Sequence, residues 1–397
     1  MAGDTTRLTG LDAARGIAVL GMFAVHVGPP PEPIGAGWLL VAADGRAPAV
    51  FTLIAGFSLA LAKQRQRQRE GWRPLLIRSA ILGLLGLLLA GLSPGILVIL
   101  AFYSVYFLAA EPFTRLRTRT LAIIAAASAV VGPVASYVLG DLLGHRTSGR
   151  GGTPVPQDLA SWSGFGEMAE KLLLTGAYPL LTYFPYVLIG LALGRLATRT
   201  GSRPAGLHHP RTAWLLTAWG AAAALAGYGL SWLLVEKGGA RQGLLAAIAR
   251  EHPWALERDD PIGAVLGSQY GAIPSTSWDW LAVAGPYSQT PLETLGNAGV
   301  GAALIGLAVA LARAPLAARV LRPLAAVGTM ALSVYVVHAL ALAFALHGWT
   351  GWDALKWFSV TAVLACCVWQ YALRGTPLKR GPLEWALRAL SSPPRKA

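Results

Sequence analysis

The first long apolar segment carries three ionisable residues, Asp12, Arg15 and His26. Asp12 and Arg15 are one helical turn apart and can pair on one face. His26 follows Arg15 at a spacing of roughly 16 Å along a helix and close to three whole turns, so both point to one side. An imidazole accepts a proton near neutral pH. The pattern favours a functional face with His26 as a base; the alternatives are an ion pair that only orients the helix and a histidine that only hydrogen-bonds a neighbouring helix.

A second histidine, His338, lies in a late apolar segment one turn after Tyr335. Ionisable groups inside a membrane span are costly, so each one marks a functional site by default. Two such histidines favour a water-accessible cavity, although hydrogen bonding between helices is the alternative. A hydroxyl such as that of Tyr335 or Ser333 can donate a hydrogen bond to negative charge that develops on an oxygen during a reaction.

Charged residues also flank the second and third apolar segments. Asp44 and Arg46 precede one of them and form either a polar clamp near His26 or an ordinary helix start with a favourable acid. Arg73 and Arg78 follow a strongly basic stretch. A guanidinium group can donate two parallel hydrogen bonds to two oxygens of one phosphate. The sequence has no P-loop or dinucleotide fingerprint. A phosphate-bearing ligand would therefore be held by such arginines.

The segment 286–293 contains the pattern of a helix start. Thr290 fits the N-cap, Pro291 the first helical position and Glu293 the third, which together form a capping box. We favour this structural role for Thr290.

The elements that must position these residues are transmembrane helices. Of the 397 residues, 54% are hydrophobic and 13% are charged, against roughly 25% charged in an ordinary soluble domain. The apolar blocks approach the ~20 residues that a helix needs to cross a bilayer. We predict an all-α, polytopic membrane bundle of about ten transmembrane helices in a single domain, 1–397. The predicted spans are 11–28, 46–62, 74–91, 94–111, 120–139, 176–195, 212–235, 294–312, 324–346 and 353–373.

Basic residues are distributed unevenly between the loops on the two sides of these spans. Of the 33 Lys and Arg residues, 23 fall on the side of the N-terminus and 8 on the other side. The positive-inside rule then predicts that both termini are cytoplasmic, with a basic tail over 374–397. This dispersal also accounts for the net charge of +14 and argues against nucleic-acid binding. The adjacent Cys366 and Cys367 predict neither a disulfide nor a metal site.

Several of these motifs resemble one protein superfamily. Leu11-Asp12-Ala13-Ala14-Arg15-Gly16, followed by His26, resembles the opening helix of the transmembrane acyltransferase superfamily, and Gly328…Ser333-x-Tyr335-x-x-His338 is similar to its late helix. Other motifs look like the bacterial branch related to heparan-alpha-glucosaminide N-acetyltransferase: Asp44-Gly45-Arg46…Phe51…Gly56, Tyr178-Pro179…Gly190…Gly194-Arg195 and Ser288-x-Thr290-x-x-Glu293.

The resemblance implies a multi-pass acyltransferase of the plasma membrane, here a bacterial inner membrane. Such enzymes take an acyl group, usually acetyl, from cytoplasmic acyl-CoA and deliver it to a sugar or other hydroxyl or amine acceptor at the outer face. Acetyl-CoA is then the expected co-substrate, without a metal. Membrane lipids are the other expected partners, and a homo-oligomer is compatible with this arrangement.

The resemblance also assigns roles to the residues that match the family motifs. For the remaining residues, the expected roles follow from the chemistry of their side chains. The expected catalytic residues are His26, Asp44, Arg46, Tyr335 and His338, those for CoA are Arg15, Arg73 and Arg78, and those for the acceptor are Ser288 and Glu293. The lysosomal enzyme has its active histidine in the first lumenal loop. The corresponding loop here, 29–46, contains no histidine, and His26 matches the wider superfamily instead.

Two other classes of function are compatible with the sequence. A transporter or flippase would use the same polar cavity without chemistry, although the internal repeat that many transporters carry is not detectable here. A non-catalytic membrane scaffold predicts that His26→Ala leaves the phenotype unchanged.

Overall fold

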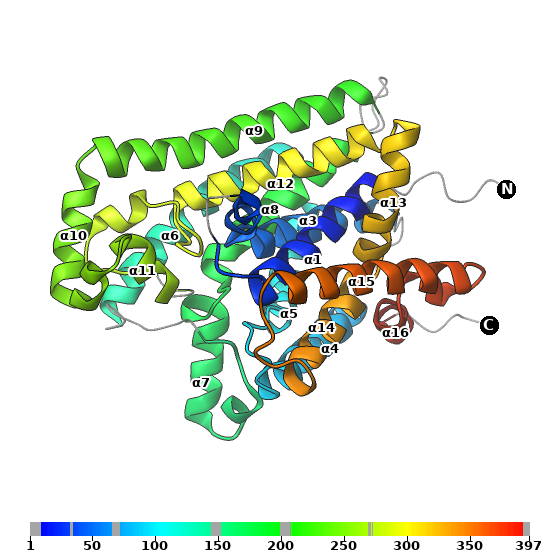
Figure 1. Cartoon of the computed structure of the whole chain (residues 1–397), viewed down its shortest axis with the longest axis horizontal. Coiled ribbons are helices and arrows are strands. Elements are labelled where there is room, and N and C mark those ends of the chain that lie inside the picture. Colours follow the sequence, from blue (N-terminus) through cyan, green and yellow to red (C-terminus); the bar gives the residue numbers. More distant parts are fainter. Residues whose placement is uncertain are drawn as a thin grey trace.

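The computed structural model is helical throughout the part of the chain that it describes, without strands in that part (Figure 1). The described residues are 9–31, 35–65, 72–143, 152–198, 207, 209–268, 271 and 273–391. The last residues of the predicted basic tail, 392–397, lie outside them. The α-helices are α1 (Thr9–Val27), α2 (Trp38–Ala43), α3 (Arg46–Arg65), α4 (Trp72–Gly91), α5 (Leu100–Ala110), α6 (Thr118–Leu142), α7 (Trp162–Glu170), α8 (Leu180–Thr198), α9 (Pro210–Trp232), α10 (Ala240–Glu251), α11 (Pro261–Ser268), α12 (Pro291–Leu311), α13 (Pro315–Thr329), α14 (Ala331–Phe344), α15 (Trp352–Ala372) and α16 (Pro382–Ser391).

Most of the predicted spans correspond to single long helices. Among the described residues, eight helices are long and apolar enough to cross a membrane: α1, α3, α4, α6, α8, α9, α12 and α15. The pair α13 and α14 passes the same test as one bent span, which makes nine. The all-α membrane bundle is thus confirmed, with one or two fewer qualifying spans than the ten predicted.

The predicted span 94–111 accounts for part of this difference, because it is helical only over Leu100–Ala110. A helix of this length measures about 16 Å, roughly half the hydrocarbon core of a bilayer. The preceding chain is irregular, with positive φ angles of 50° at Ser93 and 74° at Gly95. Ile99, at the end of this segment, is 2% exposed. Non-helical backbone at membrane depth is tolerated where protein covers it, as here.

The predicted span 324–346 is broken near Met330, and its two helices differ in direction by 70°. At the break, Glu384 of α16 accepts hydrogen bonds from the backbone N–H groups of Leu332 at 2.8 Å and Ser333 at 3.2 Å. A carboxylate is favourable there because the first N–H groups of a helix lack intrahelical partners and carry partial positive charge. The C-terminal helix therefore stabilises the start of α14.

Small residues let the helices approach closely. A Cβ atom on Gly56 of α3 would lie 2.1 Å from the carbonyl oxygen of Val187 in α8, and one on Gly190 would lie 2.0 Å from that of Leu53 in α3. Helices in lipid associate through such packing because the lipid tails are as apolar as the side chains. Gly56 and Gly190 are therefore packing residues of the contact between α3 and α8.

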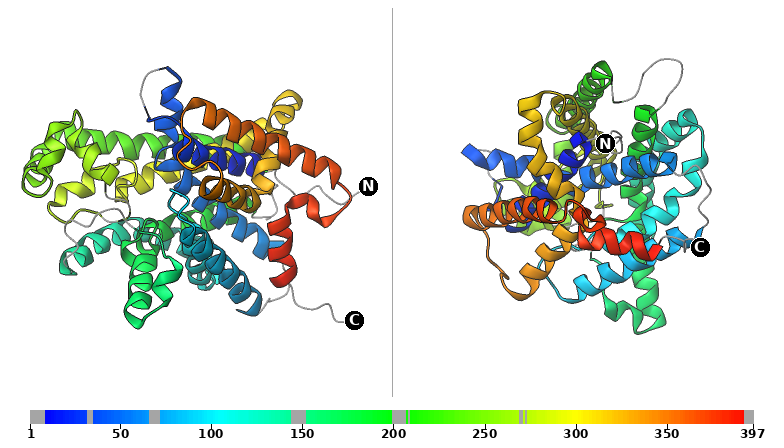
Figure 2. Two further views of the ribbon diagram at one scale, coloured as in Figure 1. Left: turned by 60° about the horizontal axis from the view of Figure 1, so that its bottom comes forward. Right: turned by 90° about the vertical axis from the view of Figure 1, so that its right-hand side faces the viewer.

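The bundle has two distinct ends. Figures 1 and 2 place α10 and α11 at one end, and α16 with the junction of α12 and α13 at the other. At the latter end, Lys63 of α3 pairs with Glu111 after α5 at 2.8 Å, and Arg78 of α4 contacts Ser391 of α16. Because α4 begins and α5 finishes near this end, the irregular segment and α5 together return the chain along the bundle.

Candidate active site

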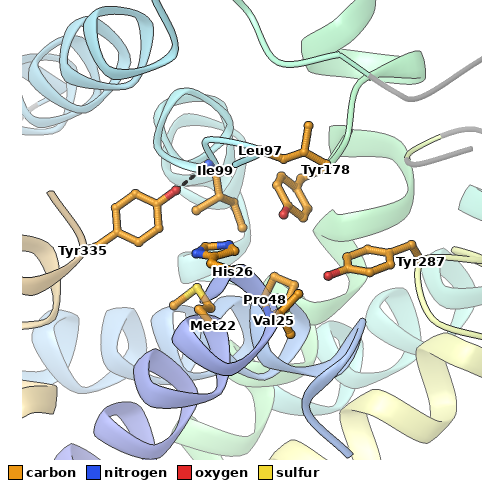
Figure 3. A pocket seen from close by; sticks show the side chains of 9 residues that line it. All are labelled: Met22, Val25, His26, Pro48, Leu97, Ile99, Tyr178, Tyr287 and Tyr335. Atoms are coloured by element: carbon orange, nitrogen blue, oxygen red, sulfur yellow. Dashed lines mark hydrogen bonds between the residues drawn. The ribbon is translucent and has the colours of Figure 1, made fainter. Parts of the chain in front are cut away.

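The end of α1, the middle of α14 and the irregular segment before α5 meet at one small cavity (Figure 3). Its lining residues are Met22, Val25, His26, Pro48, Leu97, Ile99, Tyr178, Tyr287 and Tyr335. The cavity volume is about 10 Å³, which is room for one water-sized group. A substrate group can enter only when some of these side chains move.

The two histidines singled out in the sequence are in direct contact. Nδ1 of His26 lies 3.2 Å from Nε2 of His338, and the two rings are 13° from parallel. The ring of Phe23 stacks on His338 at 4.1 Å between centroids. A base with one nitrogen held by a partner has a fixed ring orientation. Nε2 of His26 is then the nitrogen left for chemistry at the cavity.

Tyr335 adds a hydroxyl to this cavity from α14. Its oxygen accepts a hydrogen bond from the backbone N–H of Ile99 at 3.3 Å, which leaves the hydroxyl proton available to donate. Ile99 is the N-cap of α5, so the partly positive end of that helix is directed at the same place. Ser333, the other hydroxyl considered for this role, instead donates to Glu384 at 2.6 Å at the break before α14. Of the two, only Tyr335 lines the cavity.

Tyr287 reaches the cavity from the loop before α12. Tyr287 and Gln289 have φ angles of 60° and 55°, values that non-glycine residues rarely adopt. The carboxylate of Glu293 holds this conformation, because it accepts hydrogen bonds from the backbone N–H groups of Tyr287, at 3.1 Å, and of Gln289. Such strain persists only where its surroundings enforce it, so the loop is built to present Tyr287.

Ser288 and Glu293, which we expected to contact the acceptor, belong to this same loop network. Oγ of Ser288 donates to the carbonyl of Val283 at 3.1 Å and lies 3.3 Å from Glu293. Thr290 accepts from the N–H of Glu293 at 3.2 Å, which confirms Thr290 as the N-cap of α12. The structure places Ser288 and Glu293 behind Tyr287, and their contact with an acceptor stays a prediction.

Asp44 is connected to the cavity through Tyr287, whose side chain hydrogen-bonds it. Burial raises the pKa of Asp44, and the charge of Arg46 and this hydrogen bond partly oppose the shift. Arg46 itself donates to the hydroxyl of Tyr228 at 2.9 Å and to the carbonyl of Val41 at 2.8 Å. Of the predicted clamp, Asp44 thus adjoins a lining residue, whereas Arg46 joins the start of α3 to α9.

Arg15 forms the predicted ion pair with Asp12 at 3.1 Å. Its guanidinium also donates to the carbonyl of Gly328 at 3.1 Å and to Oγ of Ser58 at 2.5 Å. Arg15 therefore joins α1 to α3 and α13 and does not line the His26 cavity.

Arg73 and Arg78 lie on α4 at the α16 end of the bundle. Arg73 is exposed, and Nε of Arg78 donates to Oγ of Ser391 at 2.8 Å. The predicted CoA contacts of Arg15, Arg73 and Arg78 stay predictions.

Two parts of the cavity were not foreseen from the sequence. Tyr287 follows Pro286 in a segment that the sequence explains as a helix cap, so nothing there indicates where its ring points. The irregular segment 92–99 contains the breakers Pro94 and Gly95, which do signal a break. The predicted span 94–111 begins at Pro94, whereas the helix begins at Leu100, and the intervening Leu97 and Ile99 line the cavity.

Comparison with known families covers both halves of the chain. The model described as heparan-alpha-glucosaminide N-acetyltransferase, catalytic, matches residues 7–230, and one described as a protein of unknown function (DUF418) matches residues 239–393. The cavity combines His26 from the first region with Tyr335 from the second. A search of curated proteins finds no match. Because the first model covers more than half of the chain, this protein belongs to the heparan-alpha-glucosaminide N-acetyltransferase family of transmembrane acyltransferases.

Proposed function

We propose that the protein transfers an acyl group, typically acetyl, from cytoplasmic acyl-CoA to a sugar or other hydroxyl or amine acceptor at the outer face of a bacterial inner membrane. The observation that carries the proposal is the contact of His26 with His338 beside the hydroxyl of Tyr335. Acyl transfer needs a base at the acceptor and a donor at the carbonyl oxygen, and this cavity supplies one of each.

The reaction assigns a separate task to each group. His26 takes the proton of the acceptor hydroxyl or amine as that oxygen or nitrogen attacks the thioester carbonyl. His338 holds the other nitrogen of the His26 ring and shares the charge that the proton brings. Tyr335 donates to the oxyanion that forms, and the collapse of this intermediate releases the CoA thiolate, which takes up the proton.

The expected orientation agrees with this direction of transfer. With both termini cytoplasmic, the α16 end of the bundle faces the cytoplasm, and Arg73 and Arg78 are available there for the phosphates of CoA. His26 lies at the opposite end of α1, where an acceptor arrives from outside.

The proposal is tested with the protein in sealed, inside-out vesicles. The assay follows the release of free thiol from acetyl-CoA in the presence of each of a panel of sugar and amine acceptors. We expect turnover in the wild type and a loss of about 10²–10⁴-fold in His26→Ala, the usual contribution of a general base. His347→Ala is the control, because His347 is an exposed residue outside the cavity lining. Failure to bind acetyl-CoA in calorimetry, together with no turnover, would reject acyl transfer.

One observation favours transport as the second candidate. Transporters often place broken helices at their substrate sites, and the pair α13 and α14 is bent by 70°. Uptake or lipid flipping by reconstituted protein that survives His26→Ala would support transport instead.

A further inference from the structure

A second, larger cavity lies between α14 and α15. It is a groove of about 280 Å³, and His338 and Phe23 are among its lining residues. His338 therefore belongs to two environments: its Nε2 contacts His26 of the small cavity, and its ring forms part of the wall of the groove.

The groove has an apolar lining that matches a hydrocarbon chain. Besides His338, its hydroxyl-bearing side chains are Ser333 and Thr361, and Ser333 already donates to Glu384. The pantetheine arm of CoA carries two amide groups that would lose their hydrogen bonds to water here without replacement, which is unfavourable. A hydrocarbon chain has no such groups to satisfy.

The groove is open at its side. Val337 of α14 is 64% exposed and Trp357 of α15 is 48% exposed, and both line the groove. Since α15 and the bent pair that includes α14 are candidate membrane spans by length and hydropathy, we expect these exposed apolar side chains to face lipid. An occupant therefore enters from the bilayer and not from water.

His338, which lines the groove, carries one ring nitrogen that lacks a hydrogen bond among the described residues. Nδ1 of His338 has no hydrogen-bond partner among the described residues, although the side chain is only 3% exposed. Buried polar atoms in proteins are nearly always paired, because an unpaired one loses its hydration without compensation. A lipid with a hydroxyl or amine next to its chain would supply both the apolar fit and the missing hydrogen bond.

We propose that this groove binds the hydrocarbon chain of a membrane-lipid acceptor. One polar group of its head hydrogen-bonds Nδ1 of His338, while a separate hydroxyl or amine is the group that His26 deprotonates. This inference rests on the proposed acyl transfer and narrows its acceptor from any sugar or amine to one carried by a lipid. The acceptor would then approach the reactive pair from the bilayer side of His338.

Photocrosslinking in nanodiscs tests binding without turnover. The probe is a long-chain alcohol with a diazirine in its chain, and the matched probe is its methyl ether. We expect the alcohol to label the segments that contain Phe23 and His338. Ala365→Trp fills the groove and should reduce this labelling by about tenfold or more, because overpacking costs about 1–3 kcal/mol. Val368→Trp is the control, since Val368 is 66% exposed on the same helix and does not line the groove.

Ala341→Phe, which fills the groove from α14, repeats the test in case Ala365→Trp does not fold. Equal labelling by the two probes, or labelling that both groove-filling variants leave unchanged, would overturn the inference, because ordinary boundary lipid gives that result.

Turnover separates this inference from the proposed function. With a methyl and a dodecyl glycoside of one sugar as acceptors, Ala365→Trp should lower kcat/KM for the dodecyl glycoside by about tenfold and leave the methyl glycoside unchanged. If the variant instead alters the preference for the chain length of the acyl donor, the groove serves the donor and the inference is wrong, while acyl transfer stands. Groove labelling without turnover of any acceptor would reject acyl transfer and show only a lipid site.

Discussion

Tyr335→Phe isolates one hydroxyl of the candidate active site. The substitution removes the oxygen that accepts from the N–H of Ile99 at 3.3 Å and leaves the ring in place. A buried N–H without its acceptor costs about 1–3 kcal/mol of stability. If the hydroxyl also donates to the oxyanion, kcat should fall by about 10²–10³-fold, the usual effect of removing one such donor.

Tyr186→Phe is a matched control for this experiment. The hydroxyl of Tyr186 likewise accepts a hydrogen bond at 3.3 Å, from the amide of Asn297, and its side chain is 2% exposed against 3% for Tyr335. Tyr186 does not line the cavity. The two variants should therefore lose similar stability, and only Tyr335→Phe should lose turnover.

The assay combines thiol release from saturating acetyl-CoA with thermal unfolding of the purified protein in detergent. The proposed role of Tyr335 is refuted if both variants lower kcat to the same extent, or if Tyr335→Phe lowers it by less than about tenfold, well below the range for an oxyanion donor.

Three further predictions concern the contacts that hold the site. Gly328→Ala should abolish stable folding, because its Cβ would lie 1.8 Å from the carbonyl oxygen of Asp12. Gly229→Ala should be tolerated, because no neighbouring atom lies within 4 Å of a Cβ there. Size-exclusion chromatography of both variants tests this prediction. Arg15→Ala should lower stability by about 3 kcal/mol through loss of the partly buried ion pair to Asp12, and an unchanged melting temperature would contradict it. Burial raises the pKa of Glu384, so its contribution to stability is full below the unfolded-state pKa of about 4.3 and is lost as pH rises through the folded-state pKa. Glu384→Gln should remove this pH-dependent part of the stability, measured as the melting temperature at each pH. Parallel pH profiles of the melting temperature in wild type and variant would contradict this prediction.

The membrane bundle was predictable because its signals are local in the sequence. Apolar blocks near the length of a bilayer indicated the spans, and the long helices begin and end within a few residues of the predicted positions, as in Thr9–Val27 for 11–28. The pair Asp12 and Arg15 was predictable for the same reason, because one helical turn separates its members. The helix cap at Thr290 also depends only on neighbouring residues.

The two departures from the predicted spans have tertiary causes. A hydropathy profile does not distinguish a straight helix from one that bends where another element supplies hydrogen bonds. The start of α14 depends on Glu384, about fifty residues later in the chain, and the irregular segment before α5 is tolerated because protein covers Ile99. Both need partners that are distant in sequence.

The sequence predicted which residue types belong to the candidate site, but it did not predict which of them come together. An ionisable side chain in an apolar segment is costly wherever it lies, so His26 and His338 stood out individually. Only the packing of the helices determines that His26 and His338 touch each other, although 312 residues separate them. The same packing places Tyr287 at the cavity beside His26 and leaves Arg15 outside its lining. Local spacing determines which face of a helix a side chain occupies, whereas tertiary packing alone determines what that face meets.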